Sequence, residues 1–252
     1  MSAVDEARAA LGPVGMYVPI PFTESIPIDR QCDAARRLER AGYRTVWTNE
    51  AVGGKDVFTQ LALLMAATER VTFATGIANI WARPPQTAHG AAALLAQAYP
   101  GRLVLGLGVG YPEQAQAVGR EYGSPVATLR AYLDGMAEPP QLPAPDVSYP
   151  RIIAANGPKM LALAGSHADG AFPAGRPPEF TADARKTLGP DKLIVVGMSM
   201  EATAKPDDVA GQIQAQLEAG ADHVTIFPPS EDGFTTGMDR LTSIAPALTA
   251  VG

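Results

Sequence analysis

Residues 152–172 read IIAANGPKMLALAGSHADGAF, and this stretch decides the fold that the rest of the chain repeats. Residues 152–155 are a short apolar run that fits a buried strand. Residues 156–158 are typical of a turn, with a glycine free to take positive φ and a proline suited to the first helical position. A helix is then expected to end at Gly165 or just beyond, and residues 170–172 begin a second strand.

The turn before this helix is a candidate anion site. The first N–H groups of a helix have no intrahelical partner, and the helix dipole favours negative charge there. Lys159 lies in the first turn, where the dipole alone disfavours a cation, so its position indicates a phosphate. An ordinary strand-to-helix turn with a solvated Lys159 explains these residues equally well. We also expect Gly157 to need a positive φ, so that any side chain there would strain the turn.

Length and composition limit the classes of protein that this chain can be. The 252 residues are 46% hydrophobic and 18% charged, which suits one large α/β barrel or two small domains. The net charge of −6 argues against a protein that binds nucleic acid or a membrane surface. The single cysteine, Cys32, excludes a disulfide framework within the chain. No apolar run reaches signal or transmembrane length, so we expect a cytoplasmic enzyme.

Strand and helix patterns alternate along the whole chain. The expected strands are residues 14–18, 45–48, 71–76, 103–106, 152–155, 170–172, 193–200 and 223–227. The other expected helices are residues 29–41, 57–68, 85–99, 126–136, 179–188, 207–219 and 238–250. Eight such units predict a single TIM (β/α)8 barrel over residues 1–252, with a doubly wound open sheet as the alternative. The proline-rich residues 138–150 are expected to form an insertion loop.

The residues that follow each strand are mostly apolar or glycine, and they predict a slot for a flat cofactor. In a barrel, chemistry takes place at the carboxyl ends of the strands. The carboxylates there are Glu50, Glu113 and Glu201, which are too few and too scattered to predict a metal site. Candidate residues for an apolar wall are Phe22, Trp47, Trp81 and Tyr111, although Trp47 within a strand is more often a core residue.

Four blocks of sequence carry a family resemblance that covers nearly the whole chain. They are residues 73–85 (FATGIANIWARPP), 100–110 (PGRLVLGLGVG), 154–161 (AANGPKML) with 168–170, and 219–224 (AGADHV). Together they resemble the bacterial luciferase-like superfamily, and within it the actinobacterial oxidoreductases that use the deazaflavin coenzyme F420. The resemblance implies a TIM barrel that holds the flat deazaflavin at its strand ends.

The resemblance also implies which residues bind the coenzyme. A bulge after the third strand would support the ring, often through a non-prolyl cis peptide, here at Gly76-Ile77; a trans strand end is the alternative. A glycine loop would follow the fourth strand, and the turn at 156–159 would bind the phosphate. The candidate coenzyme-binding residues are Asn49, Gly76, Ile77, Ala78, Asn79, Gly108, Val109, Gly110, Ala155, Asn156, Gly157, Pro158, Lys159 and Met160.

Two glutamates are candidate catalytic residues. Glu113 occupies the place of a proposed proton donor in the sugar-phosphate dehydrogenase branch, and we expect burial under Tyr111 to raise its pKa. The alternative places Glu113 at the start of a helical segment, where a carboxylate suits the dipole. That branch has Asp-His after the second strand, whereas this sequence has Asn49-Glu50. Glu50 is therefore either an acid or base, or a rim carboxylate paired with Arg83 or Lys55.

The function that this resemblance implies is hydride transfer between coenzyme F420 and a small organic substrate. The alternatives are an FMN-dependent monooxygenase of the same fold and a non-catalytic barrel that binds flavin or serves as a structural subunit. Relatives often carry a helical insertion where only residues 201–206 stand here, which predicts a more open pocket or one closed by a second subunit. We expect a homodimer, because the helices at 57–68 and 85–99 are apolar beyond one face.

Overall fold

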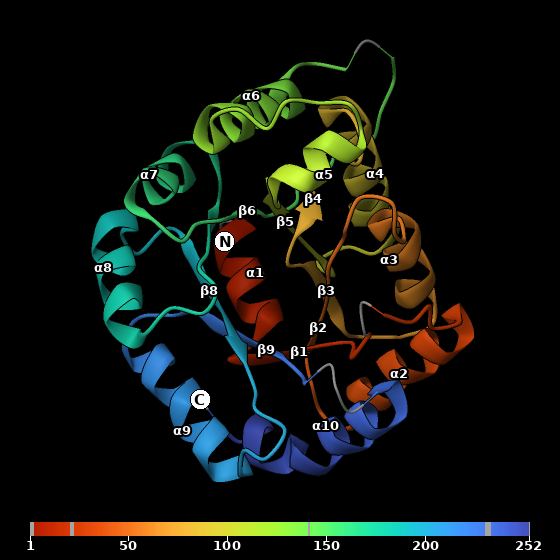
Figure 1. The fold of residues 1–252 in the computed structure, drawn as a ribbon, viewed down its shortest axis with the longest axis vertical. Coiled ribbons are helices and arrows are strands. Elements are labelled where there is room, and N and C mark those ends of the chain that lie inside the picture. Colours follow the sequence, from red (N-terminus) through yellow and green to blue (C-terminus); the bar gives the residue numbers. More distant parts are fainter. Residues whose placement is uncertain (1–2, 21–22, 141, 230–232, 252) are drawn as a thin grey trace.

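The computed structural model describes residues 3–20, 23–140, 142–229 and 233–251, and Figure 1 shows them as a ring of helices around a closed sheet. The strands are β1 (Val14–Tyr17), β2 (Thr45–Thr48), β3 (Thr72–Thr75), β4 (Ala78–Asn79), β5 (Leu103–Gly108), β6 (Arg151–Ala154), β7 (Gly170–Phe172), β8 (Leu193–Ser199) and β9 (His223–Phe227). All described pairings are parallel, in the order β3-β2-β1-β9-β8-β7-β6-β5. The sheet closes where Phe73 and Ala74 of β3 pair with Leu103 and Val104 of β5.

This closure confirms the predicted TIM barrel and contradicts an open sheet. The helices of the ring are α2 (Ile28–Arg40), α3 (Val57–Ala66), α4 (Pro85–Ala98), α6 (Pro125–Ala137), α7 (Pro158–His167), α8 (Pro178–Leu188), α9 (Pro206–Glu218) and α10 (Gly233–Thr249). The short α5 (Pro112–Ala117) lies inside this ring in Figure 1. Residues 138–140 and 142–150 contain no helix or strand. None of the helices in the described part of the chain has the length and apolar character needed to cross a membrane.

One helix, α1 (Ala3–Leu11), was not among those expected, and Figure 1 shows it lying across the middle of the ring. Its buried residues Val4, Ala7 and Leu11 belong to the same cluster as residues from the barrel interior. The hydroxyl of Thr45, at the start of β2, donates to the carbonyl of Leu11 over 2.7 Å. The helix therefore covers the amino-terminal mouth of the barrel.

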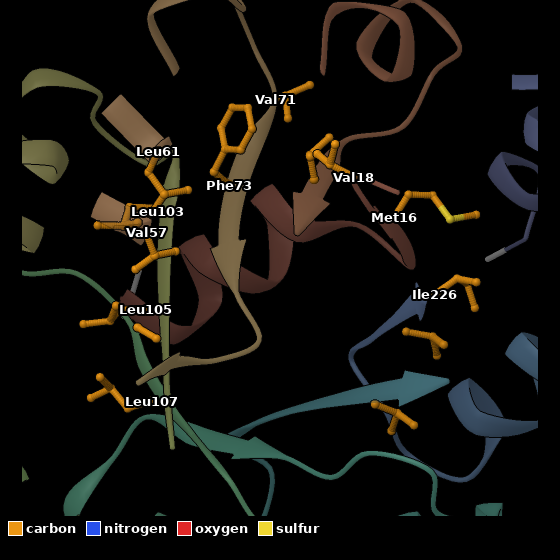
Figure 2. Close-up of a cluster of buried hydrophobic side chains, with 14 of the residues drawn as sticks. Met16, Val18, Val57, Leu61, Val71, Phe73, Leu103, Leu105, Leu107 and Ile226 are labelled. Atoms are coloured by element: carbon orange, nitrogen blue, oxygen red, sulfur yellow. The ribbon is translucent and has the colours of Figure 1, made fainter. Parts of the chain in front are cut away.

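Side chains alternate along each strand between two cores. The larger core lies between strands and helices and includes Val57 and Leu61 of α3 and Leu103 of β5, which are among the buried side chains drawn in Figure 2. The smaller core is inside the barrel, because apart from α1 it contains strand residues: Tyr17, Trp47, Ala74, Val104, Ile152, Phe172, Leu193 and Val195. The strands thus read as continuous apolar runs, since both of their faces are buried.

Aromatic side chains fill the barrel interior, and glycines on neighbouring strands make room for them. Trp47 stacks on Phe172 with ring centroids 5.4 Å apart, and its indole N–H donates to Nε2 of His223 over 3.0 Å. A Cβ added to Gly15 would lie 2.7 Å from that same Nε2. Trp47 is therefore a core residue, and its alternative placement in a cofactor wall is wrong.

Candidate functional site

A cavity of about 410 Å³ opens at the carboxyl ends of the strands, where the barrel fold places chemistry. Its described lining residues come from several strand ends and the start of α5: Asn49, Glu50, Ala51, Gly76, Ile77, Gly108, Val109, Gly110, Tyr111, Gln114, Ala154, Asn156, Phe172, Ala174 and Phe227. Eight of the predicted coenzyme-binding or catalytic residues are thus brought together around one cavity. Ala78 and Ala155 are buried just beneath it.

The end of β3 forms one side of this cavity. The Gly76–Ile77 peptide bond is cis, as the resemblance predicts. The hydroxyl of Tyr17 donates to the Gly76 carbonyl over 2.8 Å, and a Cβ at Gly76 would lie only 1.8 Å from that hydroxyl. Only glycine fits here, because any side chain would displace the tyrosine that holds the loop.

The glycine loop after β5 lies directly beside the end of β3, where Asn79 pairs with Gly108, and it is held by side chains. The indole N–H of Trp81 donates to the Val109 carbonyl over 2.7 Å, and the hydroxyl of Tyr122 donates to the Gly110 carbonyl over 2.9 Å. Gly110 has φ +54°, and a Cβ there would lie 2.0 Å from Oε1 of Gln114. The backbone can therefore approach a ligand closely at this point.

The turn after β6 is built as predicted, except at Gly157. Oδ1 of Asn156 accepts from the backbone N–H of Ala174 over 2.8 Å, which ties the turn to β7. Gly157 caps α7 with φ −158°, so the expectation of a positive φ is wrong. The reason is Pro158, since a residue before proline is restricted to extended backbone. A Cβ at Gly157 would have no atom within 4 Å.

The start of α7 keeps its anion-binding features. In this first turn Pro158 has no N–H, and the helical bonding begins with Leu161, whose N–H donates to the Gly157 carbonyl over 3.0 Å. The N–H groups of Lys159 and Met160 are thus available. Lys159 does not line the 410 Å³ cavity; it lines a separate hollow of about 520 Å³ together with Arg130 and Asp134 of α6.

Glu50 is buried and fully engaged. One oxygen accepts from the Val57 N–H over 3.1 Å, and the other accepts from the Asn79 N–H over 2.9 Å. Arg83 binds both oxygens, with Nη1 2.9 Å from Oε2. Of the two alternatives for Glu50, the structure therefore shows the paired carboxylate, with Arg83 as the partner. This arrangement fastens the strand ends and leaves no carboxylate oxygen open to a ligand.

Glu113 is exposed, and the expectation that Tyr111 buries it is wrong. It lies in the first turn of α5, Tyr111 is itself 71% exposed, and Glu113 is not part of the cavity lining. The physical reason is that Pro112 starts the helix, and Ala115 is the residue of α5 that is buried. Gln114 lines the cavity instead, and its Oε1 accepts from the Asn79 side chain.

A second cavity of about 370 Å³ adjoins the first and shares Asn49 and Phe227 with it. Its other described lining residues are Tyr17, Val18, Pro19, Ile20, Thr48, Ser199, Pro228 and Pro229. Behind this shared wall, Nζ of Lys55 donates to Oδ1 of Asn49 over 3.4 Å. Burial lowers the pKa of Lys55, and the nearby Glu50 carboxylate opposes that shift.

Sequence reasoning did not assign Tyr17, Gln114 or Ser199 to the site. Tyr17 and Ser199 stand at inward positions of their strands. The alternation of side chains between the two faces of a strand could therefore have predicted that they point into the barrel. Of the expected wall residues, Tyr111 lines the cavity and Trp81 supports its glycine loop, whereas Phe22 lies outside the described residues.

Comparison with known proteins gives one family. The family model described as luciferase-like monooxygenase matches residues 13–189. A 5,10-methylenetetrahydromethanopterin reductase of Methanolobus tindarius is 28% identical over 170 residues, 60% of this chain and 52% of that protein. A putative coenzyme F420-dependent oxidoreductase of Mycobacterium tuberculosis is 35% identical over 109 residues, 43% of this chain and 31% of that protein. The matches thus span about half or less of these relatives.

Solved structures share the fold at low sequence identity. An F420-dependent secondary alcohol dehydrogenase, solved with an F420-acetone adduct, has a TM-score of 0.74 at 15% identity, covering 94% of this chain and 99% of that one. The oxygenating constituent of 3,6-diketocamphane monooxygenase from Pseudomonas putida, solved with FMN, has a TM-score of 0.69 at 12% identity, covering 94% and 98%.

Proposed function

The chain belongs to the luciferase-like monooxygenase family, and we propose that it is an oxidoreductase that transfers a hydride between coenzyme F420 and a small organic substrate. Curated relatives named as users of coenzyme F420 support this choice of cofactor. The observation that carries the proposal is the cavity lined by the end of β3, the glycine loop after β5 and Asn156. Its position is where this barrel must place a ligand.

The residues of this cavity fit a flat, largely apolar ring. Gly76 and Gly108 stand at inward positions, and a Cβ at Gly108 would lie 2.9 Å from the side chain of Ile77. The wall is smooth because neither position can carry a side chain. Asn156 lines the same cavity and leads directly to the first turn of α7, where free N–H groups suit a phosphate.

In this proposal three segments hold the coenzyme. They are the strand end at 76–79, the loop at 108–110 and the turn at 155–160, with Asn49 beside the first of them. When bound, the deazaflavin supplies or accepts the hydride. The chain's own residues orient the ring and exclude water, and Glu50 serves to position the strand ends because all its oxygens are occupied by protein groups.

Coenzyme titration tests the proposal. We expect F420 to bind with quenching of its fluorescence, and Lys159→Ala to weaken binding by about 1.5–3 kcal/mol, the range for a charge-assisted hydrogen bond. Lys186→Ala is the matched control, because Lys186 is exposed and pairs with Asp183 on the outside of α8. Copurification of a yellow FMN chromophore would favour the monooxygenase instead. Binding of neither coenzyme would contradict an oxidoreductase role.

A further inference from the structure

The two adjoining cavities meet at Asn49, and this residue is placed to recognise a substrate. Asn49 lines both cavities, one assigned above to the coenzyme and one without an assigned ligand. The second cavity, of about 370 Å³, is large enough for a small organic molecule. A ligand in it would face the coenzyme cavity across the amide of Asn49.

Most polar groups of the second cavity already have partners within the protein. The Tyr17 hydroxyl donates to the Gly76 carbonyl over 2.8 Å, and the Thr48 hydroxyl donates to Oε1 of Gln60 over 2.6 Å. The described lining contains no charged side chain. Besides the hydroxyl of Ser199, the rest of the lining is apolar: Val18, Ile20, Phe227 and proline rings. An uncharged, mainly apolar ligand therefore suits it.

Lys55 determines which end of the Asn49 amide remains for a ligand. An ammonium can only donate, so the contact at 3.4 Å turns Oδ1 of Asn49 towards Lys55. The group left for the cavity wall is Nδ2, which is a donor only. The other cation nearby, Arg83, is occupied by Glu50 and by Asp56, to which it is 2.6 Å away.

We propose that Asn49, held in orientation by Lys55, donates a hydrogen bond to the substrate's oxygen, and that the substrate is an uncharged ketone or aldehyde with apolar flanks. A carbonyl oxygen only accepts, which matches the donor-only Nδ2 group of Asn49. Asn49 is then a substrate-binding residue, and Lys55 is a positioning residue. This inference rests on the proposed function for the identity of the neighbouring cavity.

The test compares three ring compounds of one size: cyclopentanone, cyclopentanol and cyclopentanecarboxylate. Their dissociation constants are measured on coenzyme-saturated protein, and the infrared carbonyl stretch of bound cyclopentanone reports the hydrogen bond directly. The variants are Asn49→Asp, which keeps the shape and the contact with Lys55 but removes the donor, and Lys55→Met. Lys186→Met is the matched control on the outer surface.

We expect Asn49→Asp to weaken cyclopentanone binding about tenfold and to shift its carbonyl stretch towards the value in apolar solvent. Cyclopentanol should lose less affinity, because its hydroxyl can donate to the new carboxylate. Lys55→Met should weaken cyclopentanone binding about threefold, since the Asn49 amide can then rotate. Lys186→Met should leave all three dissociation constants unchanged.

Three results would overturn the inference. The first is that cyclopentanone does not bind to the parent. The second is that Asn49→Asp leaves the ratio of ketone affinity to alcohol affinity unchanged. The third is that the parent binds cyclopentanecarboxylate more tightly than cyclopentanone and that Lys55→Met abolishes this binding. The last would show that Lys55 itself binds an anion. Coenzyme titration of each protein separates these results from failure of the proposed function, which would show as loss of F420 binding by the parent. In that case the same affinities and stretch are measured on coenzyme-free protein.

Discussion

Arg83 donates hydrogen bonds to both carboxylate oxygens of Glu50, and the same carboxylate accepts hydrogen bonds from the backbone N–H groups of Val57 and Asn79. One side chain thus joins the end of β2, the start of α3 and the short β4. The pair is nearly inaccessible, with 2% of the Glu50 side chain and 10% of the Arg83 side chain exposed. It holds the cavity wall at the point where both candidate ligand sites meet.

Replacing Glu50 with glutamine should chiefly affect stability. Without the Glu50 carboxylate, the buried Arg83 keeps only the half-exposed Asp56 as an ionic partner, so we expect the free energy of unfolding to fall by about 3 kcal/mol in urea titrations. Asp56→Asn is the control: Asp56 also pairs with Arg83 but is half exposed, and asparagine can still cap α3. Parental stability together with a hundredfold loss of turnover would instead assign Glu50 to acid–base chemistry.

Glu113→Gln should leave turnover within about twofold of the parent. Glu113 is exposed in the first turn of α5, so it contributes a few tenths of a kcal/mol to the helix and no proton to the cavity. Single-turnover hydride transfer measured against pH checks this. Gln114→Ala, which removes a cavity residue bound to Asn79, should have the larger effect on coenzyme affinity. A rate reduced a hundredfold in the Glu113→Gln variant alone would restore the proton-donor hypothesis.

Substitutions at Gly157 separate charge from backbone strain. Because φ is −158° and a Cβ would meet nothing, Gly157→Asn should fold normally and bind the coenzyme almost as well as the parent. Gly157→Asp adds a negative charge beside the proposed phosphate and should weaken binding at least tenfold at low salt, with partial recovery at high salt. Equal affinities for the two variants at low salt would place the phosphate elsewhere.

Stability should fall as the pH drops from about 6.5 to about 4, because of His223. Burial lowers the pKa of His223 to about 4, while the Gly12 carbonyl and Asp222 oppose that shift. In this window the unfolded chain binds a proton that the folded protein does not, so acid favours unfolding by up to about 3 kcal/mol.

The variant that checks this is His223→Gln, since an amide can accept from the Trp47 indole and donate to the Gly12 carbonyl as the imidazole does. Its unfolding free energy should depend less on pH between about 4 and 6.5 than that of the parent. His167→Gln, at the more exposed end of α7, should retain the parental dependence. Identical pH profiles for the parent and His223→Gln would assign the acid sensitivity to other groups.

The protein should be a dimer that uses the outer faces of α3 and α4. Leu63 of α3 is 46% exposed and Leu94 of α4 is 57% exposed, although a barrel helix needs only one apolar stripe towards the strands. Sedimentation at micromolar concentration should show a dimer for the parent and a monomer for the double variant Leu63→Glu, Leu94→Glu. A monomeric parent would contradict the prediction.

The barrel and much of its site could be predicted because they depend on local patterns. Eight apolar runs alternate with helices, and each run is buried on both faces, so the strands were recognisable without knowing their neighbours. The turn at 156–158 also followed from local sequence, whereas the cis bond at Gly76–Ile77 was implied by the family resemblance alone. Helix α1 was missed because its apolar face packs into the barrel mouth, a partner that exists only after the barrel has closed.

What the sequence determined by itself was the order of elements, the ends of the strands that carry the site, and the glycines that keep its wall smooth. Tertiary structure decided which side chains meet there. It buried Glu50 against Arg83, exposed Glu113 and brought Lys55 to Asn49. The physical reason is that helix and strand periods are properties of neighbouring residues. Burial, ion pairing and amide orientation instead depend on groups that only the closed barrel brings within hydrogen-bonding distance.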